Sequence, residues 1–240
     1  KERPWSSEIR AVDPVTGKTK WAISRDGWQD RSGVLATRSG LAVFGTLSGK
    51  LVVIDTDTGK VLKQIDTGRS IMAAPMTYKV NGVQYLAVQT GWGGGGWGLV
   101  PEYSAAYAKG NANRLLVFRL DGGPVPVPPD LPPLDPIPAP PAQRPGVTPQ
   151  IIAQGSSLFS QNCSICHSNR PRASLPSLQR MTPGTHTLFD RIVLDGLLLQ
   201  TGMPRWDDLL TPDQVNAIHA HLIDTQRKAF EDQSQGRPAA

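Results

Sequence analysis

Apolar and polar residues alternate in short runs over the first half of the chain, with turn-forming residues between the runs. Residues 34–38 and 41–46 are two such runs, and their alternation predicts β-strands. Residues 11–21 read as strand, Asp-Gly turn and strand, and residues 53–63 repeat the pattern. The two copies lie 42 residues apart, a period typical of β-propeller blades. We therefore predict four strands per repeat.

A third set of strands follows the second copy. Residues 72–80 and 84–89 flank Asn81-Gly82, which is a strong hairpin signal. After a glycine-rich stretch the strand pattern resumes at residues 115–120. Residues 1–123 thus hold the end of one blade, one full blade and three strands of another. Because so few blades would leave sheet edges exposed, we expect another segment or chain to supply the rest.

The second half of the chain changes to a helical period. One predicted helix starts at Thr148, which is followed by proline, a second covers residues 188–199, and a third starts at Thr211. We predict a small all-α domain over residues 148–227. The polar residues 228–240 read as a flexible tail. The fold class is therefore all-β plus all-α in one chain.

Residues 124–147 separate the two halves. Eleven of the 22 residues from 124 to 145 are proline, and none is glycine. Such a stretch favours polyproline II and predicts a semi-rigid spacer between two domains. A ligand for an SH3-type domain is the alternative interpretation.

Composition and charge exclude some functions. The net charge is +5, with +6 in residues 1–123, −1 in residues 124–147 and zero in residues 148–240. The basic excess lacks the aromatic-interleaved Lys/Arg clusters of nucleic-acid readers, so we interpret it as a solvated basic face and expect no nucleic-acid partner. The chain also lacks an apolar run long enough to span a membrane.

The sequence Cys163-Ser164-Ile165-Cys166-His167 carries the most specific chemistry. The pattern C-x-x-C-H is the attachment sequence of c-type haem: each thiol bonds one vinyl group, and the histidine is an axial ligand of the iron. A zinc half-site or a thioredoxin-type redox pair are the alternatives. Zinc would need two further ligands, and the chain has only these two cysteines. Covalent haem attachment predicts a periplasmic protein whose signal sequence lies upstream of Lys1.

A six-coordinate haem iron needs a second axial ligand, and Met203 is the predicted one. It lies between glycine and proline, 36 residues after His167, and a thioether ligand raises the haem potential. Met72 and Met76 belong to predicted strands, and Met181 lies in a polar stretch close to the attachment sequence. The metal ligands in this prediction are therefore His167 and Met203.

The remaining candidates near the haem are weaker. His186, His219 and His221 are rival ligands, but His219 and His221 lie two residues apart on one predicted helix and face different directions. We interpret all three as ordinary surface or packed histidines. Arg205 and Trp206 follow the predicted methionine ligand and could bond a haem propionate.

The repeat A-x-D-x-x-T-G-x-x-x-W resembles that of the eight-bladed dehydrogenases that use pyrroloquinoline quinone (PQQ). Residues 70–78, 81–88 and 91–94 resemble their last blade. With the haem sequence following, the chain is similar to the C-terminal part of a quinohaemoprotein alcohol dehydrogenase. The resemblance implies the terminal blades of an eight-bladed propeller followed by a class I cytochrome c domain. In this family the enzyme's N-terminus supplies the absent fourth strand.

The same resemblance implies three cofactors: covalent haem c, PQQ and calcium. Trp28 matches the tryptophan that stacks on the quinone, and Gly91 and Trp92 match a segment beside it. Without the resemblance, Trp28 would read as a packing aromatic and the region after Gly91 as a surface loop. Residues 29–32, Gln-Asp-Arg-Ser, depart from the small turn that relatives have there. Pro176 matches the proline that supports the proximal histidine in class I cytochromes.

The implied function is alcohol oxidation at PQQ, with electrons passing to haem c and then to a soluble acceptor such as a cupredoxin or a cytochrome. The family's catalytic base and calcium ligands belong to earlier blades, so we expect no catalytic residue in this chain. Two alternatives stay open. One is an electron-transfer module on a propeller docking scaffold without quinone chemistry. The other is a quinohaemoprotein that oxidises a sugar or a cyclic amine.

Overall fold

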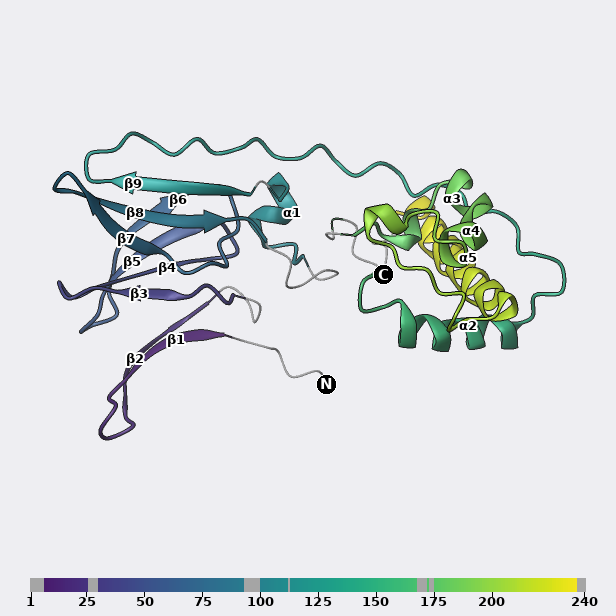
Figure 1. Cartoon of the computed structure of the whole chain (residues 1–240), viewed down its shortest axis with the longest axis horizontal. Helices are drawn as coiled ribbons and strands as arrows, with labels where there is room; N and C mark the ends of the chain where they lie inside the picture. The colour runs from purple at the N-terminus through teal and green to yellow at the C-terminus, as the bar shows by residue number, and fades with distance from the viewer. Residues whose placement is uncertain are drawn as a thin grey trace. The chain divides into compact units, whose positions relative to one another are not determined.

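The computed structural model describes residues 7–25, 30–92, 100–111, 113–167, 172 and 175–236. The chain divides into two compact units, and the division falls between Pro132 and Pro133. Unit 1, up to Pro132, is built of β-strands, and unit 2, from Pro133, is built of helices (Figure 1). No helix within the described ranges is both long enough and apolar enough to cross a lipid bilayer.

Unit 1 contains three antiparallel sheets. The complete blade is a four-stranded sheet in the order β3-β4-β5-β6, flanked in sequence by a two-stranded and a three-stranded sheet. The strands are β1 (Glu8–Val12), β2 (Thr19–Ser24), β3 (Val34–Ala36), β4 (Leu41–Gly45), β5 (Lys50–Asp55), β6 (Val61–Asp66), β7 (Met76–Val80), β8 (Val83–Thr90) and β9 (Arg114–Arg119). Four strands per repeat were predicted, and the complete blade confirms that count.

The repeat has a local cause at each Asp-Gly turn. The Oδ1 atom of Asp13 accepts the N–H groups of Val15 and Thr16, and Gly17 closes the turn at φ 68°. The second copy repeats this geometry with Asp55 and Gly59. The backbone hydrogen bonds at Asp13, and at Asp55 chiefly the bond from the Thr58 hydroxyl and then the backbone bonds, hold the pKa of both carboxyls below the ordinary value. The carboxylates therefore stay charged and continue to cap the turns.

Apolar side chains between neighbouring sheets form the core of unit 1. Alternate residues of the central strands point to opposite faces, so the blade β3–β6 buries both faces. One face packs against β1 and β2, and the other against β8 and β9. The first cluster contains Ala42, Phe44, Val52 and Ile54, and the second contains Val43, Leu51, Ile71 and Val88.

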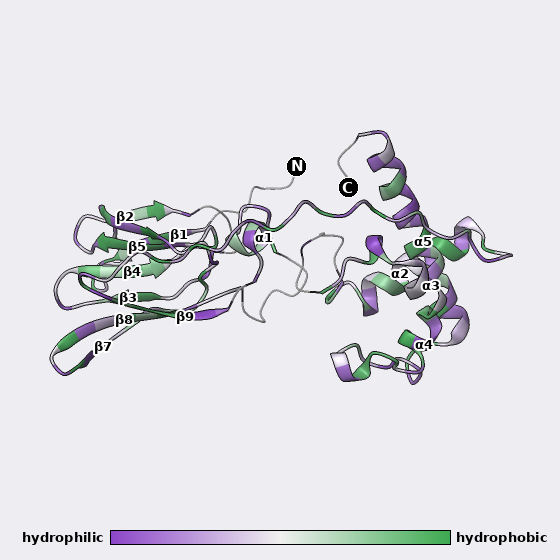
Figure 2. Cartoon of the chain, turned by 90° about the horizontal axis from the view of Figure 1, so that it is seen from above, coloured by the Kyte–Doolittle hydropathy of each residue, from purple (hydrophilic) through white to green (hydrophobic). Residues whose placement is uncertain are grey.

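Unit 2 is a small bundle with two principal helices. It contains α2 (Pro149–Asn162), α3 (Pro183–Thr187), α4 (Phe189–Val193) and α5 (Pro212–Ser234), with short 3₁₀ turns at Leu178–Arg180 and Leu199–Thr201. Thr148 and Thr211 cap α2 and α5 through their side chains, and both predicted starts are confirmed. In Figure 2, α5 carries both hydrophobic and hydrophilic residues, and its buried positions, which include Val215, Ile218 and Leu222, recur at the spacing of an amphipathic helix.

Two boundaries differ from the sequence prediction. The helix predicted over residues 188–199 ends at Val193, and its remainder forms a turn and a 3₁₀ segment. Gly196, at φ 70°, accounts for the interruption. Conversely, α5 continues to Ser234, so the predicted flexible tail does not hold for residues 228–234. Ala229 is buried there and extends the packed face of the helix.

The first part of the proline-rich segment contacts unit 1, and its second part contacts unit 2. Its first part belongs to unit 1, where the Leu131 N–H donates to the Ala108 carbonyl at 2.8 Å. Its second part, residues 135–144, lies along α5, and we call it the strap. Ile137 of the strap is 3% exposed, and its N–H donates to Oε1 of Gln233 at 2.8 Å. The strap is thus a structural part of unit 2.

Candidate functional site

A cavity of about 650 Å³ lies in the middle of unit 2. Its volume falls in the range of pockets that hold cofactors and other small molecules. Cys163, Cys166, His167 and Met203 all line it, together with apolar side chains from α2, α4 and α5. The structure therefore brings together around one cavity the four residues that the sequence associated with haem.

The first two of these residues lie where α2 ends. Cys163 is the C-terminal cap of the helix, and its carbonyl accepts the N–H groups of Cys166 and His167. This turn places both thiols and the imidazole on the lining of the cavity. The local sequence thus fixes the geometry that two thioether bonds and one metal bond require on a single face.

The ring of His167 has one nitrogen directed at the backbone. Its Nδ1 atom lies 3.2 Å from the carbonyl oxygen of Pro176. Because a carbonyl can only accept, Nδ1 carries the proton, and the lone pair of Nε2 is left for a metal. The expected support of the histidine by the backbone at Pro176 is confirmed as a contact.

The thiol of Cys163 is poorly suited to redox exchange. Burial, and secondarily the neighbouring Cys166, raises the pKa of Cys163 to about 11. A catalytic thioredoxin-type pair needs a lowered pKa, because the thiolate is the nucleophile. The described residues also contain no group of three or more His, Cys, Asp or Glu side chains that could hold zinc. Both alternatives to haem attachment thus lose support.

Two methionines, rather than one, reach the cavity. Met203 follows Gly202, which takes φ 99°, and its N–H donates to the Leu198 carbonyl at 3.2 Å. Met181 was expected in a polar stretch, but it is 4% exposed and also lines the cavity. It packs in the same cluster as Phe189, which no short-range pattern indicates. Both methionines lie outside the helices, but Met203 is only partly buried, whereas Met181 belongs to the buried wall.

The polar end of the cavity contains an indole. The Nε1 atom of Trp206 is buried and has no hydrogen-bond partner among the described residues. Trp206 lines the cavity, and an unpaired buried donor beside it is consistent with a bound group that carries acceptors. Arg205 instead pairs with Asp207 at 2.7 Å on the surface. Two thiols, an imidazole nitrogen, a thioether, apolar walls and an indole donor are a set that fits haem c.

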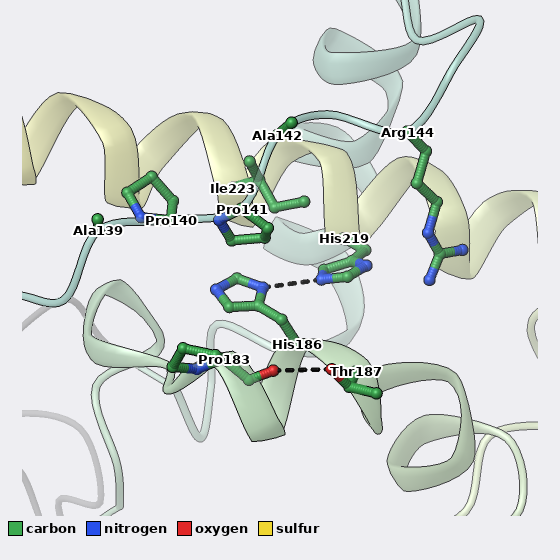
Figure 3. A pocket seen from close by; sticks show the side chains of 10 residues that line it. All are labelled: Ala139, Pro140, Pro141, Ala142, Arg144, Pro183, His186, Thr187, His219 and Ile223. Carbon is green, nitrogen blue, oxygen red and sulfur yellow. Dashed lines mark hydrogen bonds between the residues drawn. The ribbon is translucent and has the colours of Figure 1, made fainter.

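A second, smaller cavity of about 400 Å³ lies between the strap, α3 and α5 (Figure 3). His186 and His219 line it, and their rings are joined by a 2.9 Å bond between Nδ1 of His186 and Nε2 of His219. Both are packed in the interior, at 6% and 3% exposed. The sequence pattern predicts surface or packed histidines here, and the structure shows that they are packed. The pattern does not predict that they pair, because the two residues are 33 positions apart.

The residues predicted to contact PQQ are only partly described. Trp28 and Gln29 lie outside the described residues. Gly91 takes φ 121°, and a Cβ atom there would lie 1.7 Å from Oδ1 of Asn113, so only glycine fits. Trp92 is 1% exposed and packs against Leu47 within unit 1.

The residues that depart from the family's turn have structural partners. Asp30 is buried, accepts the Leu47 N–H at 2.6 Å and lies 3.6 Å from Nε of Arg25. The hydroxyl of Ser32 accepts the Gly45 N–H and donates to the Ala73 carbonyl. These side chains hold the start of β3 to the neighbouring strands.

Comparison with known proteins matches both units. Residues 150–222 match the family described as cytochrome C oxidase, cbb3-type, subunit III. Residues 23–86 match the β-propeller domain of glucose/ethanol/alcohol dehydrogenases.

Three individual relatives extend the likeness over nearly the whole chain. Quinohemoprotein alcohol dehydrogenase ADH IIB of Pseudomonas putida is 32% identical over 97% of this chain and 34% of its own length. Lupanine 17-hydroxylase of a Pseudomonas species is 33% identical over 94% of this chain and 32% of its own. The structure of ADHIIG from Pseudomonas putida HK5 superposes with a TM-score of 0.79 at 30% identity, over 96% of this chain and 32% of that one.

The chain thus spans about a third of the length of these relatives. Both units are matched, in the same order along the sequence. Over nearly its whole length the chain is thus homologous to a part of the quinohaemoprotein alcohol dehydrogenases.

Proposed function

We propose that the chain is the electron-accepting part of a periplasmic, PQQ-dependent alcohol dehydrogenase. Alcohol is oxidised at a PQQ held mainly by other blades, and electrons reach a haem c in unit 2 and then a soluble acceptor. The observation that carries the proposal is the cavity of unit 2, where Cys163, Cys166, His167 and Met203 meet. Calcium, when present, is bound by residues outside this chain.

Each residue of the cavity has a distinct role in the proposal. Cys163 and Cys166 anchor the haem by thioether bonds, so that it cannot dissociate. His167 binds through Nε2 because Nδ1 is engaged by Pro176. Met203 supplies the soft second ligand that raises the potential. The haem itself supplies one-electron chemistry, and the chain's residues hold it and exclude water from its faces.

In unit 1 the proposal assigns Trp28 to stacking on the quinone and Gly91 and Trp92 to its edge. The lack of space for a Cβ at Gly91 keeps this backbone in one position. The burial of Trp92 against Leu47 means that its contribution is a rigid wall rather than a mobile side chain.

A direct test uses the complete assembly, reconstituted with PQQ and calcium. Adding a primary alcohol should reduce the haem, seen as the sharpening of its visible absorption bands. A double variant, Cys163→Ala with Cys166→Ala, should lose covalent haem on a denaturing gel stained for haem. An intact haem that no alcohol reduces would contradict the dehydrogenase and favour the electron-transfer module.

A second candidate substrate class has support from one comparison. The similarity to lupanine 17-hydroxylase favours a cyclic amine as strongly, by identity, as the alcohol dehydrogenases favour an alcohol. The same haem-reduction assay decides between them when alcohols and cyclic amines are added in separate runs. Reduction by cyclic amines alone would assign this substrate class.

A further inference from the structure

Three buried side chains form a continuous hydrogen-bonded chain beside the haem cavity. Nε2 of His219 lies 2.9 Å from Nδ1 of His186, whose Nε2 lies 3.0 Å from Oε1 of Gln226. The amide nitrogen of Gln226 then donates to the carbonyls of Pro138 and Met181, at 2.9 and 3.0 Å. This series of hydrogen bonds therefore links the strap to the wall of the haem cavity.

The positions of the protons follow from the two carbonyls at the end of this chain. Because both carbonyls accept from the amide nitrogen of Gln226, its Oε1 atom must accept, so Nε2 of His186 carries a proton. Nδ1 of His186 is then an acceptor, and Nε2 of His219 donates to it. In the neutral pair this leaves Nδ1 of His219 as a bare lone pair. It is buried and has no hydrogen-bond partner in the part of the chain that the structure describes.

Among the three side chains His219, His186 and Gln226, that lone pair is the one position where a further proton can bind without breaking a hydrogen bond. The 400 Å³ cavity lined by both histidines has room for several water molecules, so a source of protons lies next to the pair. Figure 3 shows the hydrogen bond that joins the two rings, with Arg144 of the strap on the other side of His219.

His219 is separated from the haem cavity by a single aromatic ring. Its imidazole stacks on Phe189 with ring centroids 4.3 Å apart and an interplanar angle of 9°. Phe189 is itself a wall of the haem cavity. A charge on His219 would thus act on the iron through protein rather than through water. Charges interact much more strongly through protein than through water.

The charges around His219 oppose its protonation on balance. Its pKa is lowered to about 4, chiefly by burial and then by Arg144 and His186, whereas Asp190 on α4 raises it. Asp190 is shared with Arg144, whose guanidinium donates to it at 3.0 Å. His186, on α3, is held below its ordinary pKa by burial. The pair is neutral near pH 7, and small changes in nearby charge shift its proton affinity.

We propose that His219 is a redox-linked proton site, which binds one proton from solvent at Nδ1 when the haem accepts an electron. The proposal rests on the proposed haem in unit 2. Reduction removes one positive charge behind Phe189, so the imidazolium form becomes more stable. By linkage, protonation of His219 raises the midpoint potential of the haem by the same coupling. The electron comes from the substrate through the quinone. The positive charge of the proton bound by His219 offsets the negative charge of this electron.

The test is the pH dependence of the haem midpoint potential in the full chain, measured by spectroelectrochemical titration from pH 7 down to about 4, the pKa of His219. We expect the potential to rise as the pH falls. A tenfold difference in proton affinity between the two oxidation states gives a total rise of about 59 mV. His219→Gln keeps a donor for His186 but cannot take up the proton, so the rise should shrink in this variant.

His221→Gln is the matched control, because His221 lies on the same helix, has a pKa lowered by burial and faces Phe159 instead of the pair. The rise should persist in this variant. A rise of unchanged size in His219→Gln, or its disappearance in His221→Gln, overturns the proposal and assigns the effect to the propionates or to His221. A flat wild-type profile also overturns it.

A second measurement does not depend on any variant folding. The pKa of His219, followed by its imidazole proton resonances in the wild-type protein, should be higher in the reduced state than in the oxidised state. Equal values would contradict the coupling. Absence of covalent haem from the purified protein is a separate result, and it would count against the proposed function instead.

Discussion

At the scale of single residues, the proposed haem-binding residues and the histidine pair are positioned in different ways. Cys163, Cys166 and His167 lie within five positions, so their geometry follows from one turn at the end of α2. The pair His186 and His219 depends on the packing of α3 against α5, which no local pattern encodes. For the same reason, the sequence could not show that Met181 reaches the cavity of Met203.

Replacing the two cavity methionines should separate ligand from wall. In Met203→Leu the haem potential should fall by more than about 0.1 V, within the roughly 0.8 V range that axial ligands set. Met181→Leu conserves volume and should cost less than about 1.5 kcal/mol of stability, with little change in potential. Redox titration and the sulfur-to-iron absorption of the oxidised haem provide the measurement. The reverse pattern would make Met181 the ligand.

His219 should also make the protein sensitive to acid. Its pKa is lowered from 6.5 to about 4 in the folded state, so between these values the unfolded chain binds more protons. The free energy of unfolding should therefore fall as the pH drops from 6.5 to about 4, by up to about 3 kcal/mol. Urea unfolding at a series of pH values measures it. His219→Gln should flatten this part of the profile, and an unchanged slope would contradict the assignment.

At the scale of elements, starts of helices were predictable and their ends were not. Thr148 and Thr211 cap through their own side chains, so the signal is local. The end of α5 at Ser234 depends on the strap, because Gln233 accepts the N–H of Ile137. The helix α1 (Ala105–Lys109) was missed altogether, since it is only five residues long and follows a glycine-rich stretch.

The crossing of α2 and α5 leaves no room for a side chain at Gly155. A Cβ atom there would lie 1.9 Å from the carbonyl oxygen of Ala217. Gly155→Ala should therefore destabilise unit 2 by about 2 kcal/mol, which lowers the midpoint of thermal unfolding by roughly 10 °C.

Gly184→Ala is the matched control for this change. Its nearest contact would be a side-chain oxygen at 3.8 Å, and alanine favours the helix, so stability should rise by up to about 1 kcal/mol. Thermal unfolding followed at a haem absorption band measures both variants. Equal effects of the two changes would show that the crossing is not tight.

At the scale of the whole molecule, the division into a β unit and an α unit was evident from the change of hydrophobic period. The position of the division was not, because it lies within the proline-rich segment, between Pro132 and Pro133. Prolines predict an extended backbone. Whether such a backbone is free in solvent or packs on a helix depends on the hydrogen-bond partners that the side chains of the helix provide. Here α5 offers Gln226 and Gln233 as partners.

The strap should contribute measurably to the stability of unit 2. Ile137 is 3% exposed, so Ile137→Ala should cost about 2–5 kcal/mol of unfolding free energy. Leu134→Ala provides the comparison, since Leu134 is 39% exposed and should cost less than about 1 kcal/mol. Chemical unfolding followed by haem absorbance measures both. Similar small costs would mean that residues 135–144 act as a free spacer.

The indole of Trp21 reaches across from one blade to the next. Its Nε1–H donates to the carbonyl of Thr56 at 2.9 Å, and a Cβ at Gly59 would collide with its ring at 2.8 Å. The first repeat is thus bonded to the turn of the second, whereas the matching position of the second repeat is the exposed Lys63. In mechanical terms, this bond strengthens only one side of the complete blade. Under tension, we expect the sheet β3–β6 to separate from the sheet β7–β9 before it separates from β1–β2.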